Sequence, residues 1–155
     1  RCEREKRVIT SLYLSPTELE EKNLSRFARY KLVEQRETDF ESYCMEDAEI
    51  CLVAYGIAAR VSRSAVAMAR EKGIRAGLIR PITLWPFPSE ALLRVAGHVR
   101  QFLSVELSMG QMMQDIELAI RCRRPVSLVS RVGGMIPAPE EVLAAIERAA
   151  KGETL

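Results

Sequence analysis

Polar and charged residues follow four apolar stretches of the chain. The apolar stretches are residues 48–55, 74–79, 101–106 and 126–130, and the residues at or after their ends are Gly56 with Arg60, residues 80–87, residues 106–111, and residues 131–134. If the stretches are parallel strands, their carboxyl ends meet at one edge of a sheet, where open α/β sheets bind ligands and partners. That edge is therefore the expected position of a functional site.

Glu106 is a carboxylate at this edge whose position suits acid–base chemistry. It closes an apolar stretch and precedes residues 107–111, so it could act as a general base or accept a hydrogen bond from a neighbouring amide. A single carboxylate does not define an active site. The simpler interpretation, which we favour, is an ion pair with Arg80 or Arg131 across neighbouring strand ends.

The remaining candidates for catalysis or nucleotide binding lack partners. Ser62 and Ser64 have no histidine near them in the sequence, and a serine nucleophile needs an activating base. Residues 56–59 supply a single glycine, Gly56, where the dinucleotide-binding fingerprint needs three. The phosphate-loop pattern Gly-x-x-x-x-Gly-Lys-Ser/Thr does not occur. We therefore predict no catalytic residue and no cofactor-binding residue.

The cysteines do not predict a metal site. Cys2, Cys44, Cys51 and Cys122 have no Cys-x-x-Cys spacing, and the single histidine, His98, is distant from all four in the sequence. Zinc and iron–sulfur sites need closer groupings of such ligands. We interpret the cysteines as reduced structural or surface thiols.

A proline-rich segment, residues 80–88, carries the single tryptophan of the chain, Trp85. A large aromatic side chain in a rigid loop either covers the core or anchors a protein interface, and the sequence leaves both alternatives open. The residues expected to make interface contacts at the sheet edge are Arg80, Trp85, Glu106, Gln111 and Arg131.

Composition restricts the class of protein. The chain has 155 residues, of which 48% are hydrophobic and 28% charged, with a formal net charge of +2, as in ordinary globular proteins. Basic residues are dispersed, which argues against a nucleic-acid partner. No apolar stretch approaches the roughly 20 residues that cross a bilayer, and the charged start leads into no signal peptide. We expect a cytoplasmic protein without a membrane partner.

The order of elements predicts an α/β fold. Helical patterns near residues 57–72, 89–98, 111–121 and 139–151 alternate with the four apolar stretches. This alternation favours right-handed crossovers and a three-layer α/β/α sandwich with a mostly parallel sheet. Residues 1–47 are expected to form a connecting segment with an amphipathic helix that begins at Ser15-Pro16, and residues 48–155 the sandwich domain.

Several motifs resemble one protein family in order and spacing. They are Val-Ala-Tyr-Gly at 53–56, Gly-Leu-Ile-Arg-Pro-Ile-Thr-Leu-Trp-Pro-Phe-Pro at 77–88, Val-Glu at 105–106 with Met-Gly-Gln-Met at 109–112, and Arg-Val-Gly-Gly at 131–134. The family is the α subunits of 2-oxoacid:ferredoxin oxidoreductases, especially the 2-oxoisovalerate and 2-oxoglutarate branches. One departure is Ser108, where the family pattern has asparagine.

The resemblance implies a carboxyl-terminal domain similar to that of transketolase, with a mixed five-stranded sheet. The extra strand would lie between Lys31 and Glu46, a stretch that the residue pattern predicts as helix. It also implies a complex that uses thiamine diphosphate, magnesium and iron–sulfur clusters to form an acyl-coenzyme A and reduce ferredoxin. In such complexes a pyrimidine-type domain, expected before Arg1, and a separate thiamine-binding subunit hold the cofactor.

The favoured hypothesis is an assembly domain of such an oxidoreductase, inactive as an isolated chain. Two alternatives remain open. One is the equivalent domain of a transketolase-like protein or of a 2-oxoacid dehydrogenase β chain. The other is a free-standing domain that binds a small anion at the start of the helix after Gly56.

Overall fold

The computed structural model describes residues 8–153, and its internal contacts divide the chain after Arg36 into two units. The first unit contains the helix α1, Pro16–Arg36, in which no residue is buried. The backbone N–H of Glu18 donates to Ser15 Oγ at 3.5 Å, as the predicted helix start requires. No helix in the described part is long and apolar enough to cross a membrane.

The second unit is built on a five-stranded sheet. Its strands are β1 Phe40–Tyr43, β2 Ile50–Val53, β3 Ala76–Pro81, β4 Gln101–Glu106 and β5 Val126–Ser130, in the order β1-β3-β2-β4-β5. β1 is antiparallel to β3, and the other neighbours are parallel. The mixed five-stranded sheet implied by the resemblance is confirmed.

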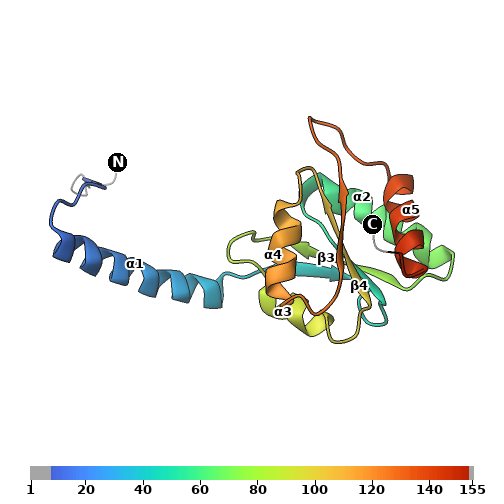
Figure 1. Ribbon diagram of the computed structural model, residues 1–155, viewed down its shortest axis with the longest axis horizontal. Helices are drawn as coiled ribbons and strands as arrows, with labels where there is room; N and C mark the ends of the chain where they lie inside the picture. The colour runs from blue at the N-terminus through green and yellow to red at the C-terminus, as the bar shows by residue number, and fades with distance from the viewer. Residues whose placement is uncertain (1–7, 154–155) are drawn as a thin grey trace, which may run out of the picture. The chain divides into compact units, whose positions relative to one another are not determined.

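Helices cover both faces of this sheet (Figure 1). The helices α2 (Gly56–Glu71) and α5 (Pro139–Ala150) pack on one face with a core that includes Leu52 and Leu103. The helices α3 (Ser89–Val95) and α4 (Gln111–Ala119) pack on the other with a core around Phe102. Side chains of a strand point alternately to the two faces of the sheet. Because helices cover both faces, the central strands β2 and β4 are buried throughout. The predicted α/β/α sandwich is confirmed.

The strand β1 corrects the helical prediction for Lys31–Glu46. The helix α1 ends at Arg36, and the chain then pairs with β3 from Phe40. The carbonyl oxygen of Asp39 accepts the backbone N–H groups of Ile82 and Thr83, at 3.0 and 3.2 Å. These long-range backbone bonds outweigh local helix propensity. The expected boundary between a connecting segment and the sandwich domain at residue 47 stays a prediction, although β1 lies in the same sheet as the other four strands.

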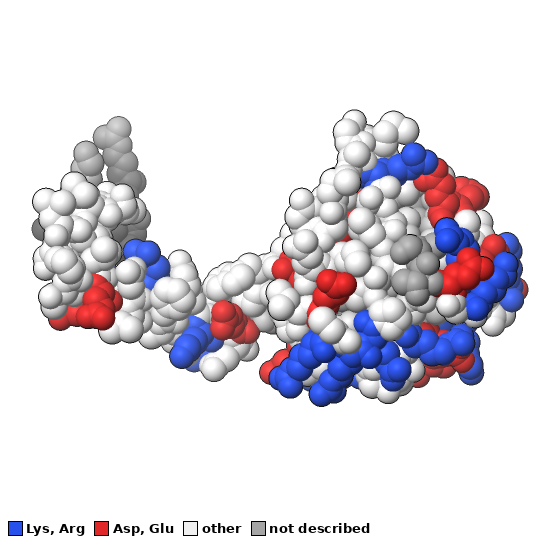
Figure 2. All heavy atoms as spheres, in the orientation of Figure 1, with Lys and Arg blue, Asp and Glu red and all other residues white. Residues whose placement is uncertain are grey.

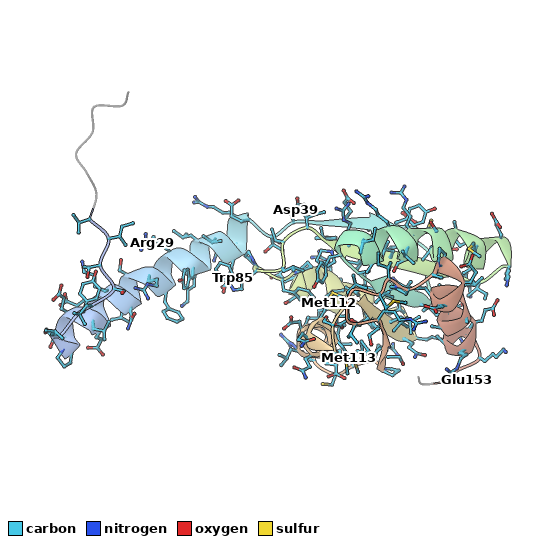
Figure 3. All side chains as sticks on the ribbon, turned by 90° about the horizontal axis from the view of Figure 1, so that it is seen from above. Arg29, Asp39, Trp85, Met112, Met113 and Glu153 are labelled. Carbon is cyan, nitrogen blue, oxygen red and sulfur yellow. The ribbon has the colours of Figure 1, made fainter. Side chains whose placement is uncertain are left out.

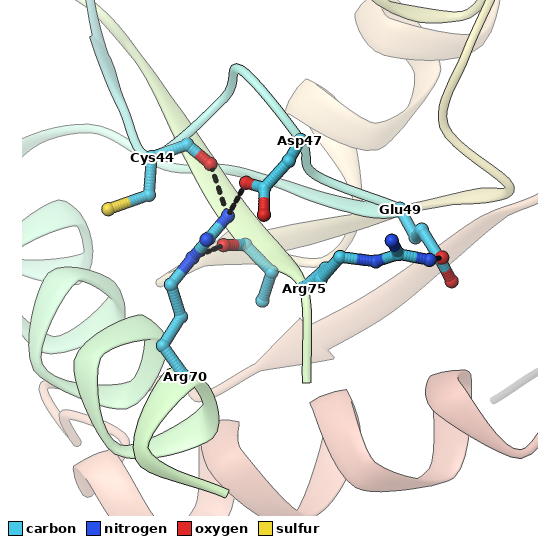
Figure 4. A network of polar contacts seen from close by, with 6 residues as sticks. Cys44, Asp47, Glu49, Arg70 and Arg75 are labelled. Atoms are coloured by element: carbon cyan, nitrogen blue, oxygen red, sulfur yellow. Dashed lines mark hydrogen bonds and ion pairs between the residues drawn. The ribbon is translucent and has the colours of Figure 1, made fainter. Parts of the chain in front are cut away.

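Arg70 ties the turn between β1 and β2 to α2 and β3 (Figure 4). Its Nε donates to the carbonyl oxygen of Ala76, and one terminal nitrogen donates to the carbonyl oxygen of Cys44 and to Asp47 Oδ1, each at 2.7 Å. Gly77 lets this turn approach β3, because a Cβ at Gly77 would lie 2.6 Å from the Cys44 oxygen. One guanidinium therefore joins three elements.

Two local predictions were less accurate. The strand expected over residues 74–79 begins and ends two residues later, as β3. It extends beyond residue 79 because its last two residues pair with β1 alone. The helix expected near residues 89–98 ends earlier, at Val95, and Pro88 precedes its first residue without a side-chain cap. Proline fixes the backbone angle φ and so directs the chain into the helix without a hydroxyl cap.

Candidate functional site

The carboxyl ends of β2, β3, β4 and β5 lie at one edge of the sheet because these strands are parallel. The predicted meeting of the four loops is therefore confirmed. These loops and the first turn of α2 carry exposed large apolar side chains, which we call the apolar rim. Its members are Tyr55, Ile57, Ile82, Leu84, Trp85, Leu107, Met109, Val132, Met135 and Ile136.

The apolar rim holds almost all exposed large apolar side chains of the second unit. Among its described residues, Leu118 on α4 is the one such side chain outside the rim. In Figure 2 the loop after β5, at the top of the sheet unit, is mostly uncharged, whereas lysine and arginine gather along the lower border. Exposed large apolar side chains gathered at one edge, beside charged surfaces, are typical of a protein interface.

Glu106 lies below this edge and is 1% exposed. Its Oε1 accepts from Ser104 Oγ at 2.7 Å and from the Met113 N–H at 3.1 Å. Its Oε2 accepts from Ser108 Oγ at 2.5 Å and from the Met112 N–H at 3.2 Å. Met112 and Met113 are in the first turn of α4 (Figure 3). The carboxylate therefore caps α4 from the end of β4.

Burial alone would raise the pKa of Glu106, since it disfavours the charged form. The hydrogen bonds from Ser108, Ser104, Met112 and Met113 outweigh this effect and hold the pKa below its usual value. The carboxylate is therefore ionised at neutral pH and satisfied within the chain. This arrangement stabilises the fold and gives no access to a substrate.

The expected ion pair of Glu106 with Arg80 or Arg131 is wrong. An Arg80 terminal nitrogen lies 3.1 Å from Glu41 Oε2 across the β1–β3 pair. Arg131 contacts both carboxylate oxygens of Glu141, one of them through Nε at 3.2 Å. The hydrogen bond from Arg131 lowers the pKa of Glu141. The side chain of Glu106 instead points to the amide groups of α4, which supply its countercharge.

Trp85 is 55% exposed in the loop between β3 and α3 (Figure 3). Thr83 shapes this loop: its Oγ1 donates to the Pro86 carbonyl oxygen at 2.8 Å and accepts from the Asp39 N–H at 3.1 Å. The Trp85–Pro86 peptide bond is cis. An indole with more than half of its surface exposed does not act as a lid over the core, so the interface alternative is favoured.

The five expected interface residues differ in accessibility. Arg80, Trp85, Gln111 and Arg131 are exposed at the carboxyl edge, and Gln111 Oε1 accepts the Met109 N–H at 2.9 Å. Glu106 is buried, so it can influence a partner only through the loop that it stabilises. The interface role of the other four stays a prediction.

The described cysteines are dispersed. Cys44 is half-buried, Cys51 buried and Cys122 exposed, while Cys2 lies outside the described residues. Burial raises the pKa of the Cys51 thiol, which keeps it protonated. Within residues 8–153, no three or more His, Cys, Asp or Glu side chains come together in a way that could hold a metal ion.

Sequence reasoning missed two features of this region. One is the pair of hydroxyls, Ser104 and Ser108, that hold Glu106; serines two residues before and after a strand-end glutamate are a signal that could have indicated them. The other is a pocket lined by arginines from α2 and β3, which long-range contacts create. Ser62, considered as a nucleophile, is buried in α2, and its hydroxyl has no hydrogen-bond partner among the described residues.

Comparison with known proteins identifies relatives. The chain is 48% identical over 145 residues to the ketoisovalerate oxidoreductase subunit VorB of Methanothermobacter marburgensis, covering 94% of this chain and 41% of the relative. It is 36% identical over 105 residues to the 2-oxoglutarate synthase subunit KorA of the same organism, covering 68% and 28%. The chain thus spans about two-fifths of the length of the first relative.

Solved structures support the fold. The 2-oxoglutarate:ferredoxin oxidoreductase from Magnetococcus marinus matches with a TM-score of 0.72 and 19% identity, covering 89% of this chain and 24% of that chain. A split-gene transketolase matches with a TM-score of 0.61 and 21% identity, covering 72% and 41%. These matches confirm the expected likeness to the carboxyl-terminal domain of transketolase at the level of fold.

A family model identifies the domain family of this chain. The model for pyruvate:ferredoxin oxidoreductase core domain II matches residues 48–142, more than half of the chain. The relatives identified by sequence are also subunits of 2-oxoacid oxidoreductases. This chain therefore belongs to the pyruvate:ferredoxin oxidoreductase core domain II family.

Proposed function

We propose that this chain serves as an assembly domain of a multi-subunit 2-oxoacid:ferredoxin oxidoreductase in the cytoplasm. The complete enzyme would decarboxylate a 2-oxoacid in the presence of coenzyme A, releasing carbon dioxide and an acyl-coenzyme A while electrons pass to ferredoxin. The domain itself would contribute packing surface rather than catalytic groups. The names of the curated relatives, ketoisovalerate oxidoreductase and 2-oxoglutarate synthase, suggest the substrate class.

The observation that carries the proposal is the apolar rim. Ten exposed large apolar side chains occupy one edge of the sheet unit. Leaving such a surface in water is unfavourable, and its burial against another domain would favour assembly of the complex. Trp85 and Arg80 belong to residue types that dominate binding energy at interfaces.

The start of α4 does not fit a cofactor diphosphate. The N–H groups of Met112 and Met113, which could have met a diphosphate at the start of α4, already bind Glu106. We therefore derive no reaction step on this chain. Thiamine diphosphate, magnesium and the iron–sulfur clusters would be held by the pyrimidine-type domain, the thiamine-binding subunit and other parts of the complex.

The proposal is tested by substituting the rim in the assembled enzyme. The double variant Ile82→Ser with Trp85→Ser removes exposed apolar surface and substitutes no core residue. We expect it to co-purify poorly with the rest of the oxidoreductase and to reduce ferredoxin several-fold more slowly with 2-oxoisovalerate or 2-oxoglutarate.

The matched control is Leu118→Ser, which removes an exposed apolar side chain outside the rim. It should assemble and turn over like the wild type. Equal behaviour of the rim variant and this control would contradict the proposal. Oxoacid turnover by the isolated chain would contradict it as well.

A further inference from the structure

A pocket of about 260 Å³ opens between α2 and the β1–β3 side of the sheet. Ala59 and Leu78 contribute apolar surface to its lining. Its polar lining consists of Arg60 and Arg63 from α2, Arg80 from β3, and Glu41, Ser42 and Tyr43 from β1. The pocket therefore depends on β1, the strand that sequence analysis predicted as helix.

The charges in this pocket are unbalanced. Three guanidinium groups face one carboxylate, Glu41, which pairs with Arg80 at 3.1 Å. Both partners of that pair are exposed, and such pairs rearrange at little cost. The Arg63 guanidinium lies 4.5 Å from the centroid of the Tyr43 ring, which holds it in place. The Arg60 guanidinium makes no ion pair or hydrogen bond within the described part of the chain.

Guanidinium groups recognise phosphate and carboxylate groups through paired N–H donors. The pocket volume is below the range of about 300–1,000 Å³ that is usual for drug-sized ligands. We propose that Arg60, Arg63 and Arg80 bind a small multivalent oxyanion in this pocket. This inference goes beyond the assembly function, because it requires no other domain and none of the rim residues Ile82 and Trp85.

The pocket also relocates the anion site considered from the sequence. That alternative placed an anion at the backbone amides after Gly56. The structure instead places side chains of the same helix, one and two turns further along, and a strand residue around one open pocket. Side-chain cations around a pocket give a stronger basis for binding than a helix start alone.

The test uses the complete chain in low-salt buffer at neutral pH, titrated calorimetrically with inorganic pyrophosphate and separately with citrate. We expect saturable binding of at least one of them at a single site, weakened by added salt. In nuclear magnetic resonance spectra, the backbone amides of Ser42 and Ala59 should shift during the same titration.

The variants Arg60→Gln and Arg63→Gln should each lower affinity by about tenfold or more, the loss expected for a charged hydrogen bond. Both side chains are exposed, so the fold should be retained, which circular dichroism will check. Arg60→Lys should lose less than Arg60→Gln, because it keeps the charge. The matched control is Arg123→Gln, an exposed arginine in the turn after α4, which should bind like the wild type.

Binding of pyrophosphate alone would assign the pocket to phosphate groups, and binding of citrate alone would assign it to carboxylates; binding of both supports a general oxyanion site. Absence of saturable binding with both probes would overturn the inference. So would an equal loss in Arg123→Gln and Arg60→Gln, because it would indicate general surface charge. The Ile82→Ser and Trp85→Ser variant should bind normally, so failure here is distinguishable from failure of the assembly proposal.

Discussion

At the residue scale, Glu106 is the side chain whose role changed most between sequence and structure. Its position at the end of β4 suggested chemistry at the sheet edge. In the structure its two oxygens accept four hydrogen bonds, and two of the donors are backbone N–H groups of α4. A buried charge is tolerated only when it is satisfied in this way. Glu106 therefore acts as a structural cap.

We expect Glu106→Gln to destabilise the domain by about 2 kcal/mol or more at neutral pH, because the amide NH₂ would face a donor. The folded-state pKa of Glu106 is below its usual value, so its contribution is present above about pH 4.3, the unfolded value. That contribution is lost as the pH falls through the folded-state pKa. Urea unfolding of the wild type and of the Glu106→Gln variant, at pH 7 and at acid pH, measures this contribution as the difference between their free energies of unfolding.

The control for this experiment is Ser104→Ala, which removes one donor and leaves the charge. It should show a smaller loss of stability at pH 7 than Glu106→Gln. If the stability difference between wild type and Glu106→Gln stays constant down to pH 3, Glu106 does not ionise with the lowered pKa that its hydrogen bonds imply.

At the scale of elements, the Arg70 contacts decide how β1 joins the sheet. The turn between β1 and β2 has few backbone bonds of its own. Arg70 supplies donors to the carbonyl oxygens of Cys44 and Ala76 on two separate segments. A planar guanidinium can reach both because its donors are fixed in a fork. A lysine has three donors on a single nitrogen, which cannot occupy both of the guanidinium nitrogen positions.

We therefore expect Arg70→Lys to lower the free energy of unfolding by about 1–2 kcal/mol through the lost bonds to the two carbonyl oxygens. The loss should persist in 0.5 M salt, because these acceptors are uncharged. Lys72→Gln, which breaks the exposed contact of Lys72 with Glu147, should leave unfolding nearly unchanged. Equal effects of the two variants would show that Arg70 contributes only a surface ion pair.

At the scale of the whole molecule, the two units differ in how they are stabilised. The sheet unit has a core on each face of the sheet, whereas α1 buries none of its residues. An isolated amphipathic helix gains little from its own backbone bonds and relies on packing for stability. The stability of the chain is therefore concentrated in residues from 37 onward.

We expect a chain of residues 37–155 to unfold at nearly the same urea concentration as the full chain. A chain of residues 48–155, the domain expected from sequence, should unfold earlier because β3 loses its antiparallel partner and the partly buried Phe40 and Tyr43. Equal midpoints for the two truncated chains would show that β1 contributes nothing and would support a division at residue 47.

The sequence by itself determined the alternation of helices and strands, the three-layer class and the edge at which loops meet. These follow from local patterns: apolar runs such as residues 101–106 read as buried strands, and their order requires parallel crossovers. The family motifs at 77–88 and 105–112 also depend on residue order alone. Local pattern and family resemblance together therefore sufficed for the fold and the family.

Only the tertiary structure decided what depends on contacts between distant segments. β1 is strand because Asp39 and the residues after it pair with β3, some forty residues later, although the local pattern favours helix. Glu106 caps α4 rather than pairing with Arg80, because its side chain leaves the strand on the α4 side of the sheet. The arginine pocket exists because α2, β1 and β3 meet there. Backbone pairing between distant segments, and the contacts that a side chain makes with them, are properties of the folded chain rather than of any one local stretch of residues.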